Sequence, residues 1–127
     1  MDIEIKGLPE LYKKLGRLAT LDYLIPPMQA GLFRLESRMK EYPQARPSST
    51  YRRTGTLGRR WVSEPVRHIA EGLSGKIGNN TQYGVWVQSS AFQARVHAGR
   101  WQTDQQVMGE EKEFIIRLFE NAVADAM

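Results

Sequence analysis

The chain has 127 residues, of which 41% are hydrophobic and 25% are charged, and its formal net charge is +4. This length and composition fit one domain, residues 1–127, with an ordinary packed core, and they exclude wholesale disorder. Cysteine is absent, which excludes disulfides, thiolate metal ligands and a cysteine nucleophile.

The first part of the chain predicts one strand and two helices. Residues 2–6 alternate apolar and charged side chains, which predicts a short strand. Residues 7–19 and 25–42 carry apolar side chains three and four positions apart, which predicts two helices. Two prolines suit the opening of the second helix, and Pro43 ends it because the residue before a proline avoids the helical conformation.

The second part predicts a hairpin, a further strand and a final helix. Short runs rich in β-branched residues predict strands at 62–70 and 73–77, with Pro65 at a sheet edge or a bulge. Alternation over 83–87 predicts a third strand, and Asp104 suits the N-cap of the last helix. One face of that helix is traced by Val107, Glu111, Phe114, Ile115, Leu118, Phe119, Ala122, Val123 and Ala126. The expected fold class is α+β, with a small antiparallel sheet packed against two N-terminal helices and a C-terminal helix.

No targeting or membrane segment is expected. No apolar run approaches the roughly 20 residues that cross a bilayer. The opening "MDIEIKGLPE" carries acids where a signal peptide carries a basic region. We therefore expect a chain that is made in the cytoplasm and has no membrane partner.

Charge is distributed unevenly along the chain. Residues 38–67 hold eight cationic side chains and two carboxylates, which gives +6, so the rest of the chain sums to −2. Residues 109–127 hold five carboxylates and two cations, which gives −3. A basic middle and an acidic end predict complementary contacts with further copies of the chain or with an acidic partner.

The two histidines, His68 and His97, are the only imidazoles. Neither lies in a zinc-binding or nucleophile motif, and no paired-acid motif accompanies them. We expect each to make local hydrogen bonds, because catalysis needs a whole set of groups and not a single histidine. The expected catalytic residues, metal ligands and cofactors are therefore none.

The stretch "YRRTGTLGRR", residues 51–60, surrounds a Thr-Gly pair with four arginines. It lacks the lysine and the spacing of a Walker loop, which disfavours nucleotide binding. Gly55 suits a tight turn, Thr54 a cap for the residues after it, and Leu57 an anchor in the core. Residues 43–54 have no periodicity, and we expect a mobile basic loop there. The arginines face either a protein partner or the phosphates of a nucleic acid.

Trp86 lies between two valines in the strand expected over 83–87. If those valines face the core, alternation puts Trp86 on the other face, exposed or covered by another chain. Tryptophan and arginine are enriched at interfaces, so this is a hint of oligomerisation. The alternative is a sheet that the chain's own helices cover on both faces.

Two segments carry a resemblance. The first is the arrangement of Pro47, Thr54, Gly55, Leu57, Arg59 or Arg60, and Trp61. The second is "YGVWVQSSAFQARVHAGRWQT", with Tyr83, Val87, Gln88, Gln93, Ala94, His97, Gly99, Arg100, Trp101 and Thr103 at the matching positions. Both resemble the head–tail joining proteins of long-tailed bacteriophages and prophages, which are their tail-completion, neck or minor tail proteins.

This resemblance implies a virion structural protein and no enzyme. Such a protein assembles at the head–tail junction of the virion, as a ring of copies, after synthesis in the host bacterial cytoplasm. The implied partners are other connector and tail proteins, with DNA in the lumen as an alternative contact for the basic loop. The expected assembly contacts are Arg52, Arg53, Arg59, Arg60, Trp86, His97, Arg100 and Trp101.

Two other functions compete with this one. The first is a DNA- or RNA-binding module that uses the arginine-rich loop, which would be retained on DNA in a salt-dependent manner. The second is a small hydrolase that uses His68 or His97, which would lose its activity on His97→Ala. Aromatic side chains placed for base stacking are not evident from the sequence, which disfavours the DNA- or RNA-binding module.

Overall fold

The computed structural model describes residues 1–7, 21–44, 55–70 and 72–126. The helix expected over 7–19, except for Gly7 at the end of the first strand, and nearly all of the mobile loop expected over 43–54 lie outside these residues. The described part combines a three-stranded antiparallel sheet with helices, so the α+β class is confirmed.

The sheet is formed by β1 (Asp2–Gly7), β2 (Trp61–Ile69) and β3 (Gly72–Asn79). Their order is β1-β3-β2, and both neighbouring pairs are antiparallel. The first strand and the β2–β3 hairpin were therefore predicted correctly. β3 begins at Gly72, whose φ of 132° lies in a region that side chains rarely adopt.

Pro65 satisfies both expectations made for it. β2 is an edge strand, and its register against β3 shifts between Glu64 and Arg67. Because proline has no N–H to donate to a ladder, an edge strand with a bulge accommodates it without loss of an interior hydrogen bond.

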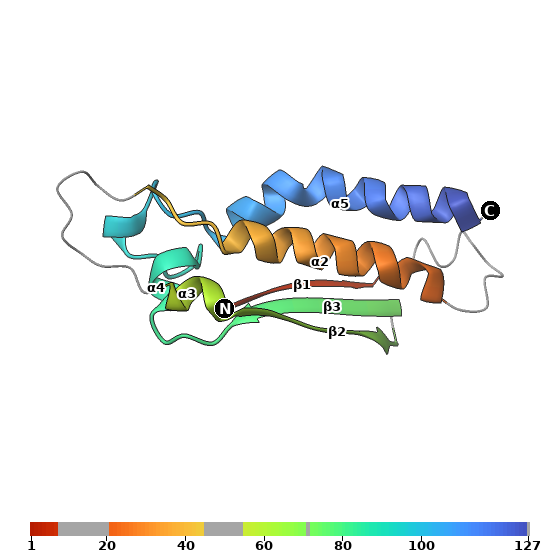
Figure 1. Ribbon diagram of the computed structural model, residues 1–127, viewed down its shortest axis with the longest axis horizontal. Helices are drawn as coiled ribbons and strands as arrows, with labels where there is room; N and C mark the ends of the chain where they lie inside the picture. The colour runs from red at the N-terminus through yellow and green to blue at the C-terminus, as the bar shows by residue number, and fades with distance from the viewer. Residues whose placement is uncertain (8–20, 45–54, 71, 127) are drawn as a thin grey trace.

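Two long helices cover the sheet. Figure 1 shows α2 (Ile25–Met39) and α5 (Asp104–Ala126) running side by side in opposite directions along the length of the strands. A short 3₁₀ helix, η1 (Asp22–Leu24), leads into α2. α2 packs on β2 and β3, while α5 packs along α2 and reaches β1. In the part of the chain that the structure describes, no helix is long and apolar enough to cross a membrane.

The core lies between the helices and the sheet. Its buried apolar side chains are Ile3, Leu21, Leu24, Met28, Leu32, Leu35, Met39, Trp61, Leu73, Ile77, Val107, Ile115 and Phe119. A glycine sets the closest approach of α2 to the sheet, since a Cβ at Gly75 would lie 2.7 Å from Leu32 Cδ1 and 2.9 Å from Met28 Sδ. The apolar periodicity of residues 25–42 thus predicted the buried face of α2 correctly, although the helix ends at Met39.

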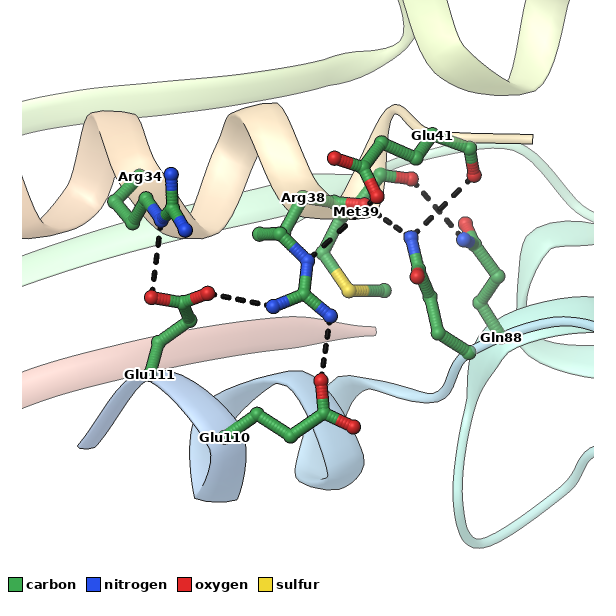
Figure 2. A network of polar contacts seen from close by, with 8 residues as sticks. Arg34, Arg38, Met39, Glu41, Gln88, Glu110 and Glu111 are labelled. Atoms are coloured by element: carbon green, nitrogen blue, oxygen red, sulfur yellow. Dashed lines mark hydrogen bonds and ion pairs between the residues drawn. The ribbon is translucent and has the colours of Figure 1, made fainter. Parts of the chain in front are cut away.

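A charged network joins α2 to α5 at the edge of this core (Figure 2). Arg34 Nε donates to Glu111 Oε2 at 3.0 Å, and Arg38 Nη1 donates to Glu111 Oε1 at 2.5 Å. Arg38 Nη2 reaches Glu110 Oε2 at 2.5 Å. Glu111 is buried, and the Arg34 hydrogen bond lowers the pKa of its carboxyl against the opposing effect of burial, with Arg38 adding to the lowering.

This network bears on the uneven charge of the sequence. Glu110 and Glu111 belong to the acidic C-terminal stretch, and Arg38 belongs to the basic middle stretch. They pair within one chain, so part of the complementary charge already serves the fold. The expected contact between these stretches in neighbouring copies stays a prediction.

The start of α5 differs from the expected N-cap. Thr103 Oγ1 accepts from the Gln106 N–H at 3.2 Å, and the Thr103 carbonyl accepts from the Val107 N–H at 3.0 Å. Thr103 therefore caps the helix, and Asp104 is its first residue. Asp104 Oδ1 instead accepts from the backbone of Ser90 at 2.9 Å, which ties the preceding loop to the helix.

The prediction of a strand over 83–87 is wrong, because α4 (Gly84–Gln88) forms there. Gly84, Val87 and Gln88 are buried, and their spacing of three and four is that of a helix. Alternation over five residues does not separate a strand from a single helical turn. The third strand of the sheet is β1, which is distant in sequence from the hairpin that it joins.

Candidate partner-binding surface

Residues 55–60 and 79–103 gather at one end of the molecule, and we call them the end region. Figure 1 shows α3 (Thr56–Arg59) and α4 close together at this end, beyond the long helices. The end region contains six of the eight residues that the sequence singled out. The other two, Arg52 and Arg53, lie outside the described residues.

α3 attaches to the hairpin through its own backbone. Gly55 has a φ of +77°, a left-handed conformation that suits the tight turn predicted for this residue. Leu57 is buried as expected, and its carbonyl accepts from Asn79 Nδ2 at 2.8 Å. Asn79 Oδ1 accepts from the N–H and the hydroxyl of Thr81, which shapes the turn that leads into α4. Thr54, expected as a cap, lies outside the described residues.

A fully buried amide, Gln88, fixes α4 to the core. Its Oε1 accepts from Trp61 Nε1 at 3.0 Å, and its Nε2 donates to the Met39 carbonyl at 3.0 Å. Figure 2 shows Gln88 reaching the last residue of α2. One side chain therefore links the end of α2, the start of β2 and α4, with both of its polar ends satisfied.

A second amide, Gln93, holds the loop between α4 and α5. Its Nε2 donates to the Val87 carbonyl at 2.7 Å and to the Trp101 carbonyl at 3.0 Å. The backbone N–H of Ala94 donates to the Trp86 carbonyl at 2.7 Å. These bonds fold residues 89–103 back against α4, and they fix the orientation of the segment that carries Trp86.

His97, Arg100 and Trp101 lie in this loop, the first of them in the 3₁₀ helix η2 (Arg95–His97). The Trp101 ring packs edge-on against Tyr42, with centroids 5.0 Å apart, and against His97 at 6.4 Å. Arg100 Nη2 donates to the Gln44 carbonyl at 3.1 Å. All three side chains thus join the loop to itself or to the segment after α2.

Trp86 points out of the end region with 55% of its surface exposed. Its ring lies edge-to-face with Phe92, which is 60% exposed, at a centroid separation of 6.5 Å. Tyr83 and Val96 are also exposed. The sequence offered the exposure of Trp86 as one of two alternatives, and it did so from a strand that does not form. It missed the other three, although all of them follow β3 within one short segment.

Arginines accompany these apolar side chains. Arg59, Arg60 and Arg95 are exposed, and Arg100 is partly exposed. Residues 55–60 and 79–103 contain no aspartate or glutamate. The end region therefore exposes both aromatic side chains and arginines. The absence of acids over this stretch was readable from the sequence.

The two histidines do not meet. His68 lies near the far end of β2, where its Nε2 is 3.0 Å from Asp22 Oδ1, whereas His97 lies in the end region. Within the described ranges, no three histidine, cysteine, aspartate or glutamate side chains cluster as a metal site would require.

Comparisons with known proteins found no match among protein-family models, curated proteins or solved structures.

Proposed function

We propose that this chain is a non-enzymatic structural protein of the head–tail junction in a long-tailed phage or prophage particle. In this role it assembles as a ring of copies and contacts connector and tail proteins. The proposal starts from the resemblance carried by residues 83–103 and does not involve a cofactor or a catalytic residue.

One structural observation supports it. The residues that carry the more specific part of the resemblance are those that build the end region. Gln88 and Gln93 hold α4 and the following loop, and Trp101 packs on Tyr42. The result is a fixed surface with an exposed tryptophan and several arginines, which is the composition of a protein interface. A binding role explains why so many polar bonds maintain an apolar surface in water.

The test is complementation of a phage or prophage that encodes this chain and carries a deletion of its gene. We expect the deletion to accumulate filled heads and separate tails, seen by electron microscopy. Replacement of Arg52, Arg53, Arg59 and Arg60 by serine should reduce the number of tailed particles. The protein should stay folded, because Arg59 and Arg60 are exposed and exposed charges add little stability. Arg117→Ser, which removes an exposed cation from α5, is the control and should complement fully.

Two further variants separate assembly from folding and from catalysis. Leu57→Asp buries a charge without a partner and should unfold the protein, so it defines the zero level of the assay. His97→Ala should abolish no hydrolytic activity. Tailed particles at normal yield from the deletion strain would refute the proposal, and so would a nuclease or hydrolase activity that His97→Ala removes.

Nucleic-acid binding is the second candidate. The sequence disfavoured it because no aromatics were evident for base stacking, but Tyr83, Trp86 and Phe92 are exposed beside the arginines of the end region. Retention on DNA that falls steeply with salt, and that the four-serine variant loses, would favour this candidate.

A further inference from the structure

The exposed part of the end region has an unusual composition for a surface. It presents Tyr83, Trp86, Phe92 and Val96 together with Arg59, Arg60 and Arg95. Lysine, aspartate and glutamate are missing from residues 79–103. Protein interfaces are enriched in aromatic residues and arginine and depleted in those same three charged types, so the composition favours a protein as the occupant.

The surface is also held in place before any partner binds. Trp86 stands on a helix turn whose next two residues, Val87 and Gln88, are buried. The Trp86 carbonyl accepts a hydrogen bond from the Ala94 N–H. The Gln93 side chain donates to the Val87 and Trp101 carbonyls, which lie before and after the loop segment that carries Phe92. A surface fixed in this way loses little conformational entropy on binding, which favours affinity.

Some of the described carboxylates that could complement these arginines are engaged elsewhere in the same chain. Several described carboxylates form ion pairs with their own cations, in the pairs Asp2–Lys76, Glu36–Lys40, Glu110–Arg38, Glu111–Arg34 and Glu113–Arg117. A second copy would have to break these pairs to offer these particular carboxylates. A different protein with unpaired acids would not.

The packing of Trp86 leaves one ring face of this aromatic pair unavailable to the bases of a single-stranded nucleic acid. Base stacking needs open aromatic faces, and the Trp86–Phe92 pair is edge-to-face with an interplanar angle of 69°. In that arrangement the edge of one ring already occupies a face of the other. Such a pair offers a ridge for apolar side chains to pack around.

We propose that the end region binds an acidic protein surface of a different chain, on which apolar side chains lie among carboxylates. The apolar groups cover Trp86 and Phe92, and the carboxylates meet the surrounding arginines. The inference rests on the proposed function for where this partner is found, namely among the proteins joined at the head–tail junction. Its test does not depend on phage particles.

The experiment uses the isolated full chain, labelled with ¹⁵N, and two synthetic peptides. One peptide alternates glutamate with leucine, and the other has lysine in place of glutamate. The tryptophan indole N–H signals report on binding, because Trp61 is buried and bonded to Gln88 whereas Trp86 is exposed. We expect the acidic peptide to shift the Trp86 signal and leave that of Trp61 in place, with an affinity that falls as salt rises.

Matched variants show whether the end region carries the binding. Trp86→Ala should lower the affinity for the acidic peptide about tenfold or more, as loss of a central aromatic anchor does. Phe33→Ala removes an aromatic side chain that is 70% exposed on α2, and it should change affinity less than about twofold. The double variant Arg59→Ser, Arg60→Ser should weaken binding and flatten the salt dependence.

Three results would overturn the inference. The lysine peptide could bind as well as the acidic one, which would remove the charge argument. Oligothymidylate could bind more tightly than the acidic peptide and shift Trp86, which would make the surface a nucleic-acid site. The chain could instead self-associate in sedimentation experiments in a way that Trp86→Ala abolishes, which would make a second copy the occupant. Loss of tailed particles on gene deletion is independent of all three results, so the proposed function can survive when this inference fails.

Discussion

The helix–sheet body and the end region of this molecule are held together by different forces. In the body, which comprises β1, β2, β3, α2 and α5, a continuous apolar core provides most of the stability. In the end region, a few side-chain amides bond to backbone groups that are distant in sequence. Apolar contacts are non-directional and numerous, whereas these amide bonds are directional and few. A destabilising substitution in the body should therefore lower the stability of the whole body, whereas one in the end region should have a mainly local effect.

The largest effect is expected from Leu35→Ala, which opens a cavity in the body. Leu35 is fully buried in the middle of α2, so its truncation should lower the free energy of unfolding by about 2–5 kcal/mol. Urea unfolding followed by circular dichroism measures this. Phe33→Ala, on the exposed side of the same helix, should stay within about 0.5 kcal/mol of the parent chain. Equal effects of the two would mean that the core is not where we place it.

The next effect is expected from Gln88→Met, which removes an amide from the end region while keeping the side-chain length. Trp61 Nε1–H and the Met39 carbonyl would lose their buried partners, which destabilises the protein by about 1–3 kcal/mol. Hydrogen exchange should accelerate across residues 79–103 more than across α2. The exposed Gln82→Met is the control. Uniform acceleration over both regions would mean that the body and the end region do not differ in how damage spreads.

A smaller effect, dependent on pH, is expected from the network between α2 and α5. The pKa of the Glu111 carboxyl is lowered below its ordinary value of 4.5, chiefly by the Arg34 hydrogen bond. Its stabilising contribution is therefore complete above the unfolded pKa, near 4.5, and is lost as the pH falls from there through the lower folded pKa.

Glu111→Gln should remove about 1–2 kcal/mol near neutral pH and flatten this acid-side slope. Urea unfolding as a function of pH measures both quantities. Glu113→Gln, at an exposed position of α5, is the control and should change the free energy of unfolding near neutral pH by less than about 0.5 kcal/mol. If Glu111→Gln keeps the acid-side slope of the parent chain, another carboxylate is responsible for it.

The smallest effect is expected from Gly109→Ala, and it is stabilising. Gly109 lies on the exposed side of α5, and a Cβ there would have no atom within 4 Å. Alanine should raise the free energy of unfolding by about 0.5–1 kcal/mol, because glycine loses more backbone entropy in a helix. A thermal melt checks this, and a lowered melting temperature would show that α5 needs its glycine for packing.

The body was predictable because its signals are local and repeated. Apolar spacing marked α2 and α5, and Pro65 correctly marked an edge strand with a bulge. The Glu111–Arg34 pair could not be read from the sequence, because its members are 77 residues apart and nothing local couples them. That distance is why acids and bases that pair within the chain were interpreted as charges available to other copies.

The end region was predictable only in part. Gly55 and Leu57 behaved as expected, since a turn and an apolar anchor are local properties. α4 was mistaken for a strand because valine flanks Trp86 on both sides, which favours β structure by propensity. Tertiary bonds of Gln88 to α2 and β2 outweigh that propensity, and a single glutamine in a sequence gives no sign of such a role. The exposure of Trp86 was thus only one of two alternatives, and the strand on which it depended does not form.

Pro65 also affects how the chain behaves at high concentration. An outer strand usually offers a row of unpaired N–H and C=O groups to which a foreign strand can add, and this is a common start of aggregation. Along β2 that row is interrupted by a residue without an N–H and by the register shift beside it. We therefore expect foreign strands to find a poor template on this side of the described sheet, so that growth of fibres from that edge is disfavoured.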